Sequence, residues 1–106
     1  MSKLLIVDDE FRIRELIKKY ATFEGHEVFE AENGLQAVDM CKQSEFDLII
    51  MDIMMPQMDG ITAMTKIREF SNLPVILLTA KSEDTDKILG LTVGADDYIT
   101  KPFNPV

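Results

Sequence analysis

Histidine and cysteine are scarce in this sequence, and the shortage excludes several kinds of site. One histidine, His26, and one cysteine, Cys41, occur among the 106 residues. Because Cys41 has no second cysteine to pair with, an internal disulfide is excluded, which agrees with a reducing compartment. The same two residues are too few and too far apart for a zinc site. We expect His26, which follows a glycine in a turn, to be solvated, and Cys41, at helical spacing, to lie in the core.

Long hydrophobic runs and basic residues are also few. No apolar run approaches the roughly 20 residues that cross a bilayer, and the opening segment turns acidic too early for a signal peptide, so we expect a cytoplasmic chain without membrane attachment. Lys and Arg number 11 against 19 Asp and Glu, a formal charge of −8. The overall field of so acidic a chain repels nucleic acid and favours metal cations or basic partner surfaces.

Short apolar runs that alternate with helical patterns predict the fold class. The strongest runs are continuous, which is typical of strands covered on both faces in a parallel sheet. Strands are expected at 4–7, 27–31, 48–51, 75–78 and 97–100, and helices near 10–23, 34–43, 60–70 and 83–92. This alternation implies right-handed crossovers and one α/β domain over residues 1–106, with a parallel sheet between helices.

Polar side chains follow four of the predicted strands at the point where each strand ends. Asp8 and Asp9 follow the first strand, Asp52 the third, Thr79 the fourth and Lys101 the fifth. In an open parallel sheet these ends emerge at one edge, where ligands of such folds bind. The sequence therefore predicts that three carboxylates, one hydroxyl and one ammonium group meet there.

This combination of groups suits phosphoryl transfer to a carboxylate. Three neighbouring carboxylates repel one another unless a cation joins them, and an all-oxygen donor set favours Mg²⁺, with Mn²⁺ as an alternative. Asp52 would attack in line, the cation would take up charge on the phosphoryl oxygens, and Lys101 and Thr79 would stabilise the remaining oxygens.

Four segments carry a resemblance to a known family. "IVDDE", "DLIIMDIMMPQMDG", "VILLTA" and "DDYITKPF" resemble the receiver domain of bacterial two-component response regulators, in the right order and over nearly the whole chain. The resemblance implies a flavodoxin-like (CheY-like), doubly wound fold, with a five-stranded parallel sheet in the strand order 2-1-3-4-5.

The resemblance also implies roles for the residues at the sheet edge. Asp52 matches the phosphoacceptor, and Asp8 and Asp9 match the acidic pair that holds Mg²⁺ together with it. Met54 matches the position whose backbone carbonyl completes the protein ligands of the metal. In addition, Thr79 and Tyr98 resemble the switch pair of the family, in which the hydroxyl turns toward the phosphoryl group and the aromatic ring moves inward. Finally, Lys101 matches the lysine at the acceptor site, and its bond to the following proline resembles the cis peptide of the family.

The function that the resemblance implies is a signalling switch rather than an enzyme, promoting only its own phosphorylation and dephosphorylation. A sensor histidine kinase or a small phosphodonor would phosphorylate Asp52. The phosphorylated state would then favour a homodimer through the fourth helix and fifth strand. The ending "KPFNP" is similar to the winged-helix (OmpR/PhoB-like) class, so control of transcription is expected through a DNA-binding domain downstream of this chain.

One departure from the family concerns the end of the chain. Family members have a fifth helix after "KPFNP", whereas this sequence stops at Val106. A few aliphatic side chains left in water, at roughly 1.5–3 kcal/mol each, would cost about as much as the whole stability of a domain. We therefore expect a chain that is less stable than a full receiver or that is completed by a second copy.

Several alternatives remain open. Taken singly, Asp52 is also compatible with a loop or helix-capping role, and 8–10 with the acidic start of a helix, Asp9 being the better candidate for direct metal contact. Thr79 is compatible with a plain strand end and Tyr98 with packing alone.

The sequence also bears on three other functions for the whole chain. A haloacid dehalogenase would need a second aspartate where Met54 stands. A flavodoxin-like nucleotide binder would need a Gly- or Ser/Thr-rich loop instead of "DDEFR". An interacting relative that is not phosphorylated would usually have lost one of the site residues.

Overall fold

Five parallel strands form one sheet in the order β2-β1-β3-β4-β5, which confirms the expected strand order. The computed structural model describes residues 2–79 and 95–100, and for Tyr98 and Thr100 it describes the backbone alone. The strands are β1 (Lys3–Val7), β2 (Glu27–Ala31), β3 (Leu48–Asp52), β4 (Val75–Thr79) and β5 (Asp97–Thr100). The expected strands agree with these bounds to within one residue.

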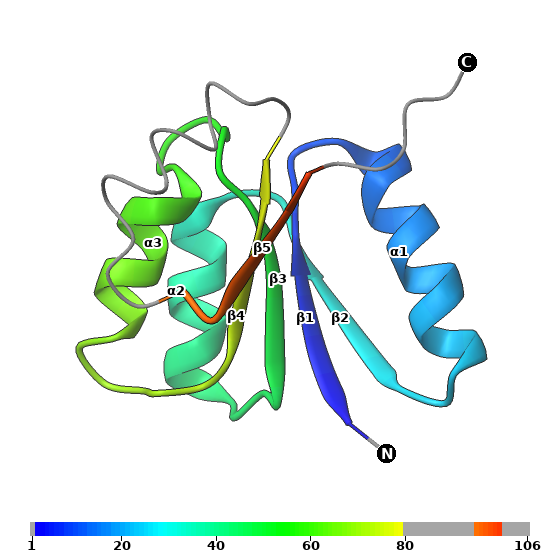
Figure 1. Cartoon of the computed structure of the whole chain (residues 1–106). Coiled ribbons are helices and arrows are strands. Elements are labelled where there is room, and N and C mark those ends of the chain that lie inside the picture. The colour runs from blue at the N-terminus through cyan, green and yellow to red at the C-terminus, as the bar shows by residue number, and fades with distance from the viewer. Residues whose placement is uncertain (1, 80–94, 101–106) are drawn as a thin grey trace.

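Helices cover both faces of the sheet (Figure 1). They are α1 (Phe11–Phe23), α2 (Gly34–Gln43) and α3 (Gly60–Ile67). α2 and α3 pack side by side on one face, and α1 is the one helix of the described residues on the other face. None of the helices in these residues is long and apolar enough to cross a membrane. The helix expected near 83–92 lies outside the described residues.

α3 is shorter than the helix expected over 60–70, because its hydrogen bonding tightens after Ile67. The N–H of Glu69 donates to the carbonyl of Lys66, three residues back rather than four. The Arg68 guanidinium then donates to the carbonyl of Leu73 at 2.6 Å, which draws the following segment back against the helix end. A side chain that satisfies carbonyls beyond the helix competes with further helical turns.

The central strands supply fully buried residues of the core. Leu5, Ile6 and Val7 of β1 are fully buried, as are Ile49 and Met51 of β3. Strands buried on both faces need no polar alternation, so the continuous apolar runs are explained. The predicted position of Cys41 in the core is confirmed, since it is 9% exposed.

An aromatic pair and a lysine pack together at the start of β1. The rings of Phe29 and Phe46 meet edge to face with centroids 5.7 Å apart. The Lys3 Nζ lies 5.1 Å from the first ring centroid and 5.2 Å from the second. These cation–π contacts tie the start of β1 to β2 and to the residues before β3.

The outer surface of α1 differs from expectation. Phe11, Tyr20 and Phe23 are 63%, 65% and 85% exposed. Tyr20 continues the i, i+3, i+4, i+7 apolar spacing that starts at Ile13 and predicts a buried position. The prediction of a solvated His26 is confirmed only in part, because the residue is half-buried and its Nδ1 is shielded from solvent. The cause is the turn after α1, which folds back so that the His26 N–H donates to the carbonyl of Ala21 at 3.0 Å.

Gly60 allows α3 to begin directly against the end of β3. Its N–H donates to the carbonyl of Ile53 at 2.8 Å. A Cβ at this position would lie 2.2 Å from the carbonyl oxygen of Asp52, a distance that backbone atoms do not tolerate. Gly25 is constrained in a different way: it has a φ of +89° but open space where a Cβ would stand.

We expect Gly60→Ala to lower the free energy of unfolding by roughly 3 kcal/mol, since the new methyl group overpacks a rigid backbone contact. Gly25→Ala serves as the matched control and should cost about 1–2 kcal/mol, because only an unfavourable φ is imposed. Urea unfolding followed by circular dichroism measures both values. Equal destabilisation by the two variants would contradict the close approach at Gly60.

Candidate metal centre

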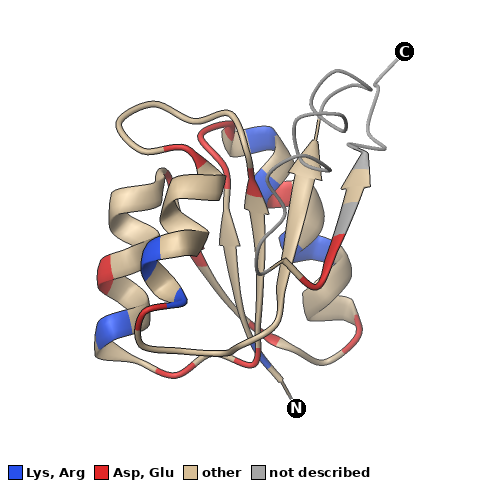
Figure 2. Cartoon of the chain, turned by 60° about the vertical axis from the view of Figure 1, so that its left-hand side comes forward, with Lys and Arg blue, Asp and Glu red and all other residues tan. Residues whose placement is uncertain are grey.

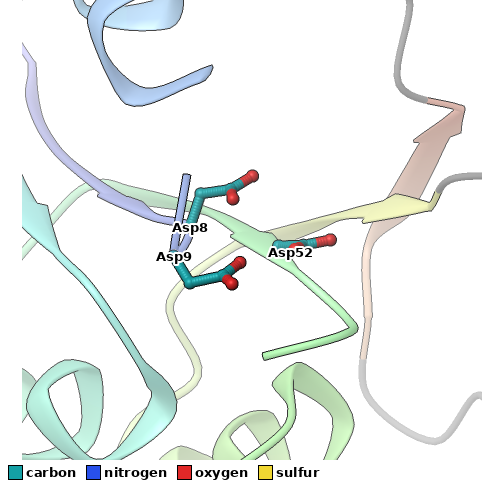
Figure 3. A group of neighbouring side chains, drawn as sticks. All are labelled: Asp8, Asp9 and Asp52. Carbon is teal, nitrogen blue, oxygen red and sulfur yellow. The ribbon is translucent and has the colours of Figure 1, made fainter. Parts of the chain in front are cut away.

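The candidate site begins with the pairing of β1 and β3. Val7 lies opposite Met51 in this parallel pair, so the next residue after each of them, Asp8 and Asp52, emerges at the same level of the sheet. One carboxylate oxygen from each of Asp8, Asp9 and Asp52 lies within 4.8 Å of the others. Figure 3 shows the three carboxylates pointing to the same side. The predicted convergence of these three residues is confirmed.

The three carboxylates differ in their access to water. Asp8 is fully buried and Asp52 is 4% exposed, whereas Asp9 is exposed. Two buried carboxylates so close together repel each other strongly, because little water screens them. A cation bound from the open side at Asp9 would relieve this repulsion.

The loop that carries Asp8 and Asp9 is held by hydrogen bonds on several sides. The Asp8 N–H donates to the carbonyl of Ala31 on β2 at 3.2 Å. Its Oδ1 accepts the N–H of Glu10 at 2.9 Å, which starts the turn into α1. This hydrogen bond supports the alternative role of the acidic segment, to begin the first helix, and that role is compatible with metal binding.

A buried arginine in this loop region was missed by the sequence analysis. Arg14 on α1 is 9% exposed, and its Nη1 donates to the backbone carbonyl of Asp8 at 2.7 Å. The available signal was its position three residues before Ile17, which places both residues on the same face of the helix. A charged residue in that pattern is usually interpreted as solvated.

The remaining predicted site residues are described to different extents. Thr79 is the fully buried last residue of β4, the strand that pairs with β3 beside Asp52. Tyr98 lies opposite Leu77 in the β4–β5 pair. Lys101 and the peptide bond that follows it lie outside the described residues. Met54 is two residues beyond Asp52 with a side chain that is 58% exposed, and the role of its carbonyl stays a prediction.

Other acidic residues have structural partners and do not join the cluster. Asp59 caps α3 by accepting the N–H of Thr62 at 2.8 Å. Asp96 accepts the N–H of Val75 at 2.8 Å and the Arg68 guanidinium at 3.2 Å. Figure 2 shows acidic residues at both ends of the sheet and on the helices, so acidity alone does not mark the site.

The donor set fits a hard divalent cation. Its members are three carboxylates, and oxygen ligands of this kind suit Mg²⁺, which usually keeps several waters besides one or two carboxylates. A soft ligand is absent from the cluster, and burial raises the pKa of the Cys41 thiol to about 11, which keeps it protonated and unreactive at neutral pH.

Comparison with known proteins agrees with this geometry. Residues 4–106 match the family model described as the response regulator receiver domain. The chain is 48% identical over 104 residues to the transcriptional regulatory protein SrrA of Staphylococcus aureus. The matched region covers 98% of this chain and 43% of SrrA. The chain therefore spans less than half the length of this curated relative.

Solved structures resemble it over nearly its whole length. The receiver domain of the Francisella response regulator 1452 is 37% identical, with a TM-score of 0.87, covering 98% of this chain and 87% of that one. The response regulator TrrA of Thermotoga maritima, solved in complex with Mg²⁺ and BeF, is 39% identical, with a TM-score of 0.88 and coverages of 98% and 90%. The chain belongs to the response regulator receiver domain family, whose members are Mg²⁺-binding, phosphorylated signalling domains of two-component systems.

Proposed function

We propose that Asp52 is the phosphoacceptor of this receiver and that Asp8, Asp9 and Asp52, with the carbonyl of Met54, hold the Mg²⁺ that its phosphorylation requires. The observation that carries the proposal is the meeting of three carboxylates within 4.8 Å at the end of β1 and β3. TrrA, a structure similar to this chain, was solved with Mg²⁺, which supports the choice of metal. Mn²⁺ has the same preference for oxygen and is the alternative.

The proposed chemistry requires Asp52 as a carboxylate. A carboxylate oxygen attacks the phosphorus of a phosphohistidine or of a small acyl phosphate. The bond from phosphorus to the donor atom breaks, and the donor leaves with the electron pair. The bound cation supplies positive charge to the phosphoryl oxygens. Lys101 and the hydroxyl of Thr79 stabilise the other oxygens, and the same groups later promote hydrolysis of the acyl phosphate, so the chain modifies only itself.

The switch proposed here couples Asp52 to β4 and β5. The hydroxyl of Thr79 turns toward the phosphoryl group, and Tyr98 moves inward in response. The β4–β5 pairing, in which Thr79 lies opposite Thr100 and Leu77 opposite Tyr98, supports this coupling because both residues belong to adjacent strands. The surface of the fourth helix and β5 then favours a homodimer.

The partners follow from the family and from SrrA, a transcriptional regulatory protein. We propose that a sensor histidine kinase donates the phosphoryl group in the cytoplasm. We also propose that residues 1–106 are the receiver part of an OmpR/PhoB-like winged-helix regulator, which contacts DNA only through a domain beyond this chain. The acidic composition supports a separate DNA-binding domain.

A second copy of the chain is a further proposed partner. Phe11, Tyr20 and Phe23 give α1 an exposed aromatic surface, which supports association on that side of the sheet. The dimer forms through either this side or the fourth-helix and fifth-strand face.

Incubation with acetyl phosphate and Mg²⁺ should add one phosphoryl group, detected by mass spectrometry of the intact chain. Asp52→Asn or omission of Mg²⁺ should remove the adduct, since each removes a reacting group or its counter-charge. Asp59→Asn is the matched control: it changes an aspartate that caps α3, and phosphorylation should persist. An adduct that survives in Asp52→Asn would show that another residue is the acceptor.

Titration with Mg²⁺ by calorimetry should detect one site, and Asp9→Asn should weaken it more than about tenfold. The loss of a direct ligand costs at least as much as the loss of a group that only orients one. Asp47→Asn gives the same change of charge at the opposite end of the sheet, where Asp47 accepts the Lys3 N–H. If both variants weaken binding equally, the metal responds to the general acidity of the chain instead of this cluster.

Dilution should lower the melting temperature if a second copy binds the chain, because association stabilises the folded state by mass action. Phe23→Glu should abolish this dependence for a dimer at α1 and leave a dimer at the fourth helix and β5 unchanged. Sedimentation velocity measures the association directly. A monomer whose melting is independent of concentration and has ordinary domain stability would contradict the proposal.

A further inference from the structure

Arg14 is the one buried residue of α1, in a helix whose other charged side chains are exposed. Its Nη1 donates to the backbone carbonyl of Asp8 at 2.7 Å, and this hydrogen bond is itself buried. Its Nε donates to Glu30 Oε1 at 3.0 Å. A buried charge is costly unless it is paired and hydrogen-bonded, so the burial of Arg14 is compensated by these two contacts.

The two contacts form a closed connection around the end of β1. The Asp8 N–H donates to Ala31 on β2, while the Asp8 carbonyl accepts from Arg14 on α1. Arg14 in turn is bound to Glu30, the neighbour of Ala31 on β2. Asp8 is therefore held through both its N–H and its carbonyl, and the two connections end on neighbouring residues of β2, Ala31 and Glu30.

An arginine suits this position better than a lysine. The planar guanidinium donates in two fixed directions, toward Glu30 through Nε and toward Asp8 through Nη1. An ammonium group has the charge but lacks the rigid fork, so we expect it to keep one contact at the expense of the other. Lys18 also donates to Glu30 at 3.3 Å, but it does not bond to Asp8 and remains 47% exposed.

We propose that Arg14 is a positioning residue that fixes Asp8 and Asp9 in the arrangement that binds the cation. The inference rests on the proposed function, because it assumes that these carboxylates hold Mg²⁺. Arg14 acts through the backbone carbonyl of Asp8 and touches neither the metal nor the phosphoryl group.

The sign of the effect separates positioning from simple electrostatics. A positive guanidinium near the cluster repels a cation, so removal of its charge alone would tighten Mg²⁺ binding. Removal of a group that orients the ligands weakens binding instead, typically by 10-fold to 100-fold. The two accounts predict opposite changes for the same substitution.

The test compares Mg²⁺ affinity in four chains by calorimetry, below the unfolding transition of each one. Arg14→Gln and Arg14→Lys should each weaken binding about tenfold, with no rescue by the lysine. Lys18→Gln is the matched control, since it removes the same charge from Glu30 without a contact to Asp8, and its affinity should stay within about twofold of the original chain.

Amide hydrogen exchange provides a readout that does not depend on the metal. In Arg14→Lys the N–H groups of Asp8 and Glu10 should exchange faster, while that of Ile49 at the far end of β3 stays protected. Unchanged or tighter Mg²⁺ binding in the Arg14 variants overturns the inference and leaves the proposed function intact. An unsubstituted chain that binds no Mg²⁺ overturns both. If Arg14→Gln does not fold, Arg14→Lys alone decides the question, because it keeps the buried charge.

Discussion

The parallel pairing of β1 with β3 is the constraint on which the rest of the structure depends. Because Val7 lies opposite Met51, segments more than forty residues apart deliver Asp8 and Asp52 to one level. Like charges resist such an approach, and the apolar strands behind them, buried on both faces, stabilise it. The same two strands thus contribute to the hydrophobic core along their length and carry the acidic cluster at their carboxyl ends. The burial of the strands offsets the repulsion between the carboxylates.

The negative charge of the chain is divided between two uses. Three carboxylates each accept a backbone N–H at the start of a strand or helix and so stabilise the beginning of that element: Asp47, Asp59 and Asp96. Only the three carboxylates at the ends of β1 and β3 converge on one another among the described residues. The net charge of −8 is therefore not spread evenly over the molecule. Part of the negative charge lies on scattered groups that cap strands and helices, and part is concentrated in the cluster at the ends of β1 and β3.

The apolar runs were sufficient for the strands and for the acidic cluster, because the ends of parallel strands meet at one edge of the sheet, whereas the strand order came from the family resemblance. The sequence was not sufficient where a contact that forms only on folding overrides a local pattern. Arg14 is buried because Asp8 and Glu30 come together in space, and neither partner is close enough in the sequence to show it. Similarly, the end of α3 depends on the bond from Arg68 to Leu73, and the shielding of His26 depends on how the turn folds back on α1.

The contact of Gly60 with the carbonyl of Asp52 restricts where movement can originate. On this side the backbone of Asp52 rests against the first turn of α3, with no room even for a methyl group at residue 60. A rigid helix start therefore lies directly behind the most buried end of β3. The close approach excludes a shift of the Asp52 backbone toward α3.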